Sequence, residues 1–304
     1  MMLNAVLLIF VIVTWGYSWV LMKIGLDYMG PLTLAAWRCT LGGLAMIPLL
    51  YVNEIPLPKG GRWLDYAIVG LFQTTGMFAF MLYGMKFVSA GKTSVLLYTM
   101  SIWTSLLAHF YLKERLTTLR WLGVANGGVG ILCILGWDVL VNQNVQILFG
   151  EFLIILGAVS WAIANIWVKK RMTEENTYMI TGLQMIIGSV GLILIAFPTE
   201  GLLDIRWTWV SIGVILFTGL VASTIDFGIW FYLLKKLDTH TISVAIMLVP
   251  VSGLFFDWLI MGKALDIGIM VGGALILVGI YLVSKKPKTA EVRSQKSEVR
   301  MKTS

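Results

Sequence analysis

Ten long apolar stretches constrain the fold of this chain more than any other feature. They cover residues 3–26, 31–52, 63–86, 92–112, 117–137, 148–168, 177–197, 207–233, 240–260 and 265–284. A helix needs about 20 mostly apolar residues to cross a bilayer. Hydrophobic residues make up 58% of the chain, whereas soluble domains have about 45–50%. The sequence therefore predicts an all-α integral membrane protein with ten transmembrane helices and no separate soluble domain.

The distribution of basic residues predicts the orientation. If the N-terminus is cytoplasmic, most of the 23 Lys and Arg residues fall in inside loops and in the tail 285–304. Cytoplasmic loops carry this excess in membrane proteins. We therefore expect a multi-pass protein of the cell (inner) membrane with both termini in the cytoplasm. The net charge of +7 then needs no nucleic-acid partner. The tail 285–304 is basic and lacks apolar periodicity, so we expect it to be disordered.

An internal repeat relates the two halves of the chain. The stretch WGYSWVLMK at 15–23 is similar to WAIANIWVK at 161–169, an offset of 146 residues, and the same offset relates Arg38 to Gln184. Similar offsets continue through later segments, which gives repeats over 1–137 and 148–284. Each repeat holds five segments, and because five is odd, the second enters the membrane from the opposite side. Such inverted 5+5 repeats are typical of secondary transporters, whose substrate sites lie near the bilayer midplane between the repeats.

Several stretches resemble the EamA family of the drug/metabolite transporter superfamily. They are WGYSWVLMKIGL at 15–26, LKERLTTLRWLGVANGGVGI at 112–131, GEFLIILGAVSWAIANIWVKK at 150–170 and WFYLLKKLDTHTISVAIMLVPVSGLFF at 230–256. The resemblance implies a ten-helix inner-membrane carrier, often an exporter of amino acids or other small metabolites. Three positions depart from the family pattern, and one of them is Lys263, which replaces the glutamate that Glu114 supplies in the first half. Met100 stands where proline is usual, and Asp226 stands where an apolar or small residue is expected.

Polar and aromatic residues at mid-membrane depth form a candidate substrate cavity. Amides and hydroxyls at this depth need partners or a wet cavity, and aromatic faces can hold apolar or cationic groups. The alternative is that these side chains serve helix packing. The predicted set is Trp15, Ser18, Gln73, Met77, Tyr98, Ser101, Trp161, Asn165, Trp230 and Met247.

Arg38, Asp226 and Pro250 are candidates for gating or ion coupling. Ionisable groups inside a membrane are costly and are often functional. Arg38 is either a gate or carboxylate contact, or a structural partner of Asp27 or of backbone carbonyls. Burial favours the neutral form of a carboxyl group, so Asp226 is a candidate to load and release a proton, or else a structural acid. Pro250 removes a backbone hydrogen bond, which creates a candidate hinge.

The remaining motifs favour packing over chemistry. Cys39 and Cys133 lie in apolar runs and form no metal pattern, and no cofactor or catalytic set is expected. The glycines at 127, 128 and 130 lack the strand and the lysine of a phosphate loop. Paired glycines in segments 117–137 and 265–284 instead predict that these helices pack together or form a dimer face.

The sequence thus predicts a secondary-active transporter that works by alternating access on a small-molecule substrate. Proton coupling is one option, and the protein is either a monomer or a homodimer. An intramembrane enzyme and a channel are the alternatives. The enzyme alternative lacks a recognisable catalytic set, and the channel alternative lacks a charged ring or a filter sequence.

Overall fold

The structure, a computed structural model, describes residues 2–137, 144–237 and 239–285. These residues form helices and loops, and the described part contains no β-strand beyond an isolated bridge between Met29 and Ile205. The predicted all-α class is therefore correct. The predicted disorder of the tail concerns residues that lie outside the described ranges, apart from Lys285.

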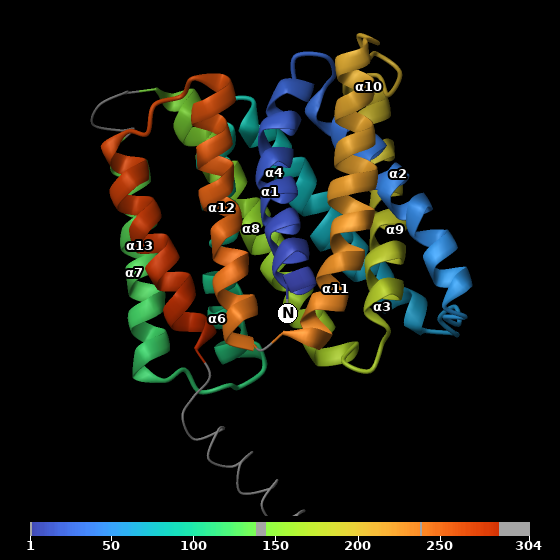
Figure 1. The fold of residues 1–304 in the computed structure, drawn as a ribbon, viewed down its shortest axis with the longest axis horizontal. Coiled ribbons are helices and arrows are strands. Elements are labelled where there is room, and N and C mark those ends of the chain that lie inside the picture. Colours follow the sequence, from blue (N-terminus) through green and yellow to red (C-terminus); the bar gives the residue numbers. More distant parts are fainter. Residues whose placement is uncertain (1, 138–143, 238, 286–304) are drawn as a thin grey trace, which may run out of the picture.

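Helices follow one another along the described parts of the chain (Figure 1). They are α1 (Met2–Gly25), α2 (Pro31–Val52), α3 (Arg62–Val69), η1 (Gly70–Gly76), α4 (Met77–Met85), α5 (Ala90–Tyr98), α6 (Met100–Tyr111), α7 (Thr118–Trp137), α8 (Val145–Arg171), α9 (Thr177–Thr199), α10 (Trp209–Leu216), η3 (Phe217–Ile225), α11 (Asp226–Lys236), α12 (Thr239–Met261) and α13 (Ile267–Ser284). We call the end of the bundle where α1 begins the lower end and the opposite end the upper end, as drawn in Figure 1.

Eight helical segments in the described chain are long and apolar enough to cross a membrane. Two of them are composite, since Arg62–Met85 joins α3, η1 and α4, and Trp209–Trp230 joins α10, η3 and the start of α11. A shorter apolar helix, Ala245–Met261, lies within α12. The chain is therefore a multi-pass membrane protein. The remaining predicted segment, 92–112, is divided between α5 and α6.

The division between α5 and α6 falls at Thr99. Its hydroxyl donates to the Leu96 carbonyl at 2.6 Å and its amide donates to the same carbonyl at 3.2 Å, a tighter turn than the α-helix. The following residue is Met100, where the sequence offered no proline to predict a kink. A threonine that bonds to its own helix thus interrupts this segment in place of proline.

Two π-helices interrupt the membrane segments at corresponding places in the two halves. They are η1, between α3 and α4, and η3, between α10 and α11. In η3 the Ser223 hydroxyl donates to the Thr218 carbonyl at 2.7 Å, across five residues. Wide turns of this kind are rare and occur often at functional sites. The apolar pattern of the sequence did not predict them.

Polar side chains at the helix N-termini satisfy free backbone amides. Local caps come from residues next to each helix: Ser89, Asn144, Asn176, Thr208 and Asp266. Helix α2 begins differently, with Pro31 at its first turn and a carboxylate from another helix. The Glu200 Oε2 atom accepts from the Thr33 amide at 2.9 Å and from its hydroxyl at 3.1 Å. This contact fixes the top of α2 against the end of α9.

Packing brings together helices that are far apart in the sequence. The closest partners are α7 with α13, α2 with α9, α4 with α8, and α1 with α12. Figure 1 shows α7 and α13 side by side at one edge of the bundle, with α1 and α12 near its centre. The largest apolar core joins α1, α2 and α4 to α5, α8 and α13.

Glycines allow α7 and α13 to approach at backbone distance. A Cβ atom on Gly130 would lie 2.6 Å from the Gly272 carbonyl oxygen, and one on Gly123 would lie 2.8 Å from that of Gly279. The reverse contacts are equally short, at 2.5 Å from Gly272 to the Gly130 oxygen and 2.7 Å from Gly279 to the Gly123 oxygen. The prediction that these two helices pack together through glycines is confirmed.

We expect Gly130→Ala to lower the free energy of unfolding by about 1–3 kcal/mol, because the new methyl group overlaps the facing backbone. Gly128→Ala is the matched control, since nothing lies within 4 Å of a Cβ at that position. The control gains helix propensity of about 1 kcal/mol without a clash. Thermal unfolding in detergent measures both. Equal stability of the two variants would contradict this packing.

Candidate functional site

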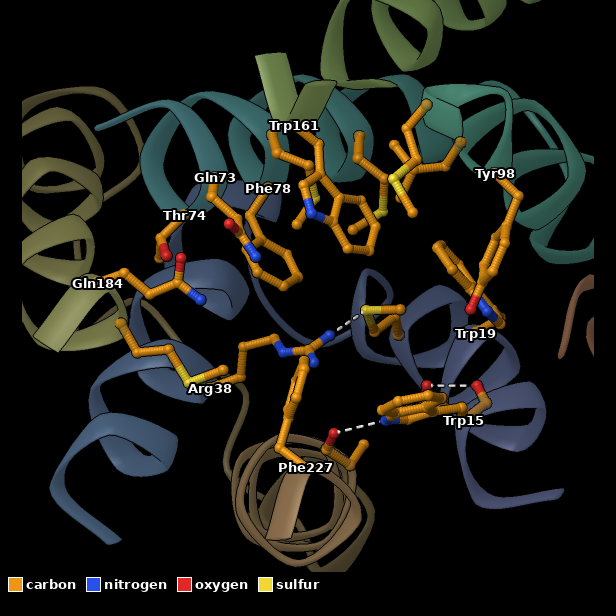
Figure 2. Close-up of a pocket in the computed structure, with 18 of the residues that line it drawn as sticks. Trp15, Trp19, Arg38, Gln73, Thr74, Phe78, Tyr98, Trp161, Gln184 and Phe227 are labelled. Atoms are coloured by element: carbon orange, nitrogen blue, oxygen red, sulfur yellow. Dashed lines mark hydrogen bonds between the residues drawn. The ribbon is translucent and has the colours of Figure 1, made fainter. Parts of the chain in front are cut away.

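A cavity of about 330 Å³ lies in the middle of the bundle, within the size range of small-molecule sites. Residues from α1, α2, η1, α4, α5, α8, α9, η3 and α11 line it, together with Met100 of α6 and Ile246 of α12. Figure 2 shows their side chains converging on one space. Both halves of the chain therefore contribute walls to this cavity.

The structure brings most of the predicted site residues together around this cavity. The lining includes Trp15, Ser18, Gln73, Met77, Tyr98, Trp161, Trp230 and Arg38. These residues come from six membrane segments that are widely separated in the sequence.

The other predicted residues lie outside the lining. Ser101 and Met247 follow the lining residues Met100 and Ile246. Asn165 lies between α8 and α6, where its amide nitrogen is 3.3 Å from the Thr104 hydroxyl. It therefore serves the contact between these helices.

Pro250 and Asp226 also lie outside the lining. Pro250 is buried inside α12, and its carbonyl accepts a long hydrogen bond of 3.4 Å from the Ser94 hydroxyl of α5. Asp226 is fully buried at the start of α11. Its Oδ2 atom accepts a hydrogen bond of 2.8 Å from the Thr14 hydroxyl of α1, while Oδ1 has no partner. The contact between Asp226 and Thr14 joins α11 to α1, the helix that carries Trp15.

Several lining residues were not predicted. They are Trp19, Met22, Thr74, Phe78, Met81, Leu97, Met100, Gln184, Met185, Ala222, Phe227 and Ile246. Helical spacing could have found some of them, because Trp19 and Met22 follow Trp15 by four and seven residues on one face. Phe227 likewise precedes Trp230 by three residues. Gln184 carried a stronger signal, as the repeat mate of Arg38.

Aromatic rings form one side of the cavity. The Trp15 ring lies 5.4 Å from both Phe227 and Trp230, measured between centroids, and its Nε1 atom donates to the Ala222 carbonyl at 2.9 Å. The ring centroids of Trp19 on α1 and Tyr98 on α5 are 6.4 Å apart. Tilted and edge-on pairs of this kind are favourable and fix ring orientation. The rings therefore offer a preformed apolar surface.

Arg38 projects from α2 into the cavity (Figure 2). Its guanidinium lies 4.5 Å above the Phe78 ring, and its terminal nitrogens donate to the Ser223 hydroxyl at 3.1 Å and to the Met22 sulfur at 2.7 Å. The Nε atom is buried without a partner. Within the described chain Arg38 forms no ion pair, so the alternative of a structural pair with Asp27 is not found.

Gln184 faces the same space from α9, as Figure 2 shows. Gln184 is almost fully buried, and its Oε1 atom lacks a hydrogen-bond partner. Gln73 and Thr74 of η1 lie near it in the same view. A buried acceptor without a partner is costly in a protein interior. Among the buried side-chain atoms of the described lining residues, one donor on Arg38 and one acceptor on Gln184 thus have no partner.

Groups that bind metals do not gather at this site. In the described ranges no three or more His, Cys, Asp or Glu residues lie close enough to hold a metal ion. Cys39 is a buried thiol next to Arg38 in α2, and Cys133 is half-buried in α7. The cavity can therefore bind a small molecule through aromatic contacts and a positive charge, which is the kind of site found in membrane transporters.

Comparison with known proteins identifies the family. The family model described as EamA-like transporter family matches residues 2–136 and 148–285. The chain belongs to this family, and the two matches correspond to its two halves. The suspected resemblance is confirmed, and the general class of the protein is a membrane transporter.

Relatives that align with this chain over most of their length are named as transporters or efflux pumps. The uncharacterized transporter YoaV of Bacillus subtilis is 33% identical, covering 90% of this chain and 94% of its own. A protein of Salmonella typhimurium named "Probable amino-acid metabolite efflux pump" is 30% identical, covering 91% and 93%. A solved structure titled "Crystal structure of protein" matches with a TM-score of 0.65 at 17% identity, covering 92% and 96%. That likeness supports the fold.

We expect Thr14→Val to lower the free energy of unfolding by about 1–3 kcal/mol, because it leaves the buried Asp226 carboxyl without its hydrogen-bond donor. Thr14→Ser keeps the hydroxyl and serves as the control. Thermal unfolding in detergent at neutral pH compares the two variants. Equal thermal stability of the valine and serine variants would contradict a stabilising role for this hydrogen bond.

Proposed function

We propose that this protein is a secondary-active carrier of the cell membrane that exports small metabolites by alternating access. The observation that carries the proposal is the cavity between the two halves, which is closed at the upper end by contacts that have no counterpart at the lower end. Two features of the packing support the proposal: the two halves pack symmetrically, and this symmetry is lost between two groups of helices.

The packing pattern supports an inverted repeat of five plus five helices. If α3, η1 and α4 count as one segment, α10, η3 and α11 as another, and α5 with α6 as a third, the chain has ten segments. Exchanging the halves then maps the packing of α1 on α12 onto that of α8 on α6, and the packing of α4 on α8 onto that of α11 on α1. It also maps η1 onto η3. The contact of Gly123 with Gly279 becomes that of Gly272 with Gly130.

The symmetry fails at the interface between two groups of helices. The first group holds α1, α2, α10–α11 and α12, and the second holds α3–α4, α5–α6, α8 and α9. At the upper end α12 and α1 pack on α5, and α2 packs on α4. The symmetry-related pairs at the lower end are α12 with α6, α12 with α8, and α11 with α9. The described residues show no comparable packing there.

Specific contacts hold the upper end closed. The Lys23 ammonium of α1 donates to carbonyls at the end of α4, those of Met85 and, at 2.9 Å, Val88. Asp257 of α12 accepts from the Gly91 amide of α5 at 2.9 Å. The repeat mate of Lys23 is Lys169, which instead pairs with Glu114 of its own group at 2.6 Å. The closure is therefore local to the upper end.

The excess of basic residues supports a cytoplasmic location of the lower end. Figure 1 shows α1 beginning and α13 ending there, so both termini would be cytoplasmic. The cavity then corresponds to an inward-open state that loads its substrate from the cytoplasm. An exporter needs such a state, and exchange between the repeats would generate the outward-open one.

The residues around the cavity divide into three proposed roles. The substrate contacts are Trp15, Ser18, Gln73, Met77, Tyr98, Trp161 and Trp230, while Ser101, Asn165 and Met247 support them from the neighbouring shell. Arg38 is the charged anchor, because it is the one charged side chain among the lining residues of the described chain. Pro250 acts at the gate, where its carbonyl meets Ser94. Asp226 is the candidate for proton coupling.

The substrate class comes from the relatives and the cavity together. The printed names of relatives from Salmonella typhimurium and Escherichia coli refer to amino-acid metabolite efflux. The volume of about 330 Å³ suits molecules of that size. We therefore propose amino acids or their small derivatives as substrates. An enzyme or a channel is less well supported, because the cavity lacks a nucleophile with its base and is closed at one end.

We expect saturable counterflow in proteoliposomes for one class in a panel of amino acids, organic acids and organic cations. We further expect Asp226→Asn to abolish transport driven by a pH gradient while exchange continues, since amide cannot release a proton. Asp27→Asn is the control, because Asp27 is exposed in the loop after α1.

Each alternative has its own result in the same assay. Flux that does not saturate would point to a channel, and chemical conversion of a panel member would point to an enzyme. Gradient-driven transport by Asp226→Asn at the rate of the unmodified protein would remove Asp226 from the coupling mechanism.

A further inference from the structure

We infer that the cavity selects a monoanion: a carboxylate with a neutral hydrogen-bond donor beside it and an apolar, aromatic-sized body. This inference deepens the proposed function and rests on it. It distinguishes among amino-acid derivatives, because a hydroxy acid has this pattern whereas a zwitterionic amino acid does not.

The first observation behind the inference is the charge that the lining residues give the cavity. Arg38 is buried, faces the cavity and forms no ion pair among the described residues. The lining contributes no carboxylate. A bound monoanion neutralises the cavity, whereas a zwitterion leaves it with the net positive charge of the guanidinium. A cation would add a second positive charge in a desolvated space, which is strongly unfavourable.

The free hydrogen-bonding atoms are the second step. Among the lining residues, Arg38 Nε is a buried donor without a partner, and Gln184 Oε1 is a buried acceptor without a partner. A carboxylate accepts from the first, and an adjacent hydroxyl donates to the second. Sites that leave polar groups unpaired with the wrong ligand discriminate strongly against it.

The contacts around Arg38 hold its guanidinium in the cavity wall. Its terminal nitrogens are held by Ser223 and Met22, and the Phe78 ring lies beneath its plane. These contacts fix the side chain while the Nε edge stays free. Arginine presents this edge to carboxylates in a planar arrangement that lysine does not reproduce.

The apolar walls define the rest of the ligand. Trp15 and Trp230 pack against each other at a tilt on one side, and Trp161 faces the same space in Figure 2. Met77 and Met81 add flexible apolar contacts that fit rings of different shape. An aromatic or branched apolar group attached to the carboxylate fills this region.

Four compounds of nearly equal shape test the inference: phenyllactate, phenylpropionate, L-phenylalanine and phenethylamine. Phenyllactate has the anion and the neutral donor, phenylpropionate lacks the donor, phenylalanine is a zwitterion and phenethylamine is a cation. Counterflow in proteoliposomes and quenching of tryptophan fluorescence in detergent give two readouts, of transport and of binding. We expect phenyllactate to be preferred about tenfold or more over phenylalanine, with phenethylamine weakest.

Variants assign the preference to its residues. We expect Arg38→Gln to weaken phenyllactate binding about tenfold or more and to remove the preference for anions. Gln184→Leu should abolish the difference between phenyllactate and phenylpropionate. Arg206→Gln is the control, because Arg206 stacks on Tyr28 at the upper surface and lies outside the cavity lining.

The outcomes separate this inference from the proposed function. Stronger binding of phenylalanine or phenethylamine than of phenyllactate overturns the inference. Unchanged phenyllactate binding to the Arg38→Gln variant also overturns it, provided that the variant elutes as a folded protein. Saturable counterflow of a zwitterion or a cation, without that of a monoanion, leaves the carrier function intact and overturns only the inferred selection of a monoanion. Absence of counterflow for every class counts against the carrier, while fluorescence still decides on the ligand.

Discussion

A bilayer interior offers no hydrogen-bond partners, so each polar group of this chain must be satisfied within the helix bundle. Most are: Thr75, Ser160 and Thr224 donate to carbonyls of facing helices at 2.6–3.1 Å. Among the described residues the exceptions include Arg38 Nε and Gln184 Oε1, which belong to cavity residues, and Asp226 Oδ1 and Asp257 Oδ1, which do not. The two exceptions in the cavity are the ones for which a bound ligand can supply the missing partners.

The two repeats share a fold but differ where a ligand would bind. Arg38 and Gln184 occupy equivalent places on α2 and α9, which pack directly against each other. One mate carries a charge and the other a neutral amide, so the two halves of the chain contribute different polar groups to the cavity. Lys23 and Lys169 differ in a related way, because one bridges the two helix groups and the other bonds within its own.

Much of this structure follows from the sequence, because apolar length and small-residue spacing act locally. The class of the fold, the packing of α7 on α13 and the cavity positions of Trp15, Gln73 and Trp161 were predictable. The π-helices and the break at Thr99 were not, since hydroxyls of Ser223 and Thr99 bond to backbone carbonyls five and three residues earlier, which an apolar pattern does not encode. The cap that Glu200 places on α2 depends on tertiary packing, which periodicity does not encode.

Distances between spin labels at the two ends of the bundle test the central claim of alternating access most directly. One pair, at Tyr111 and Tyr232, spans the lower end, and another, at Lys86 and Trp209, spans the upper end; these side chains are exposed. We expect transported substrate under a gradient to shorten the lower distance and lengthen the upper one in the same sample. Distances that stay constant during saturable transport, or that change in the same direction at both ends, would contradict the mechanism.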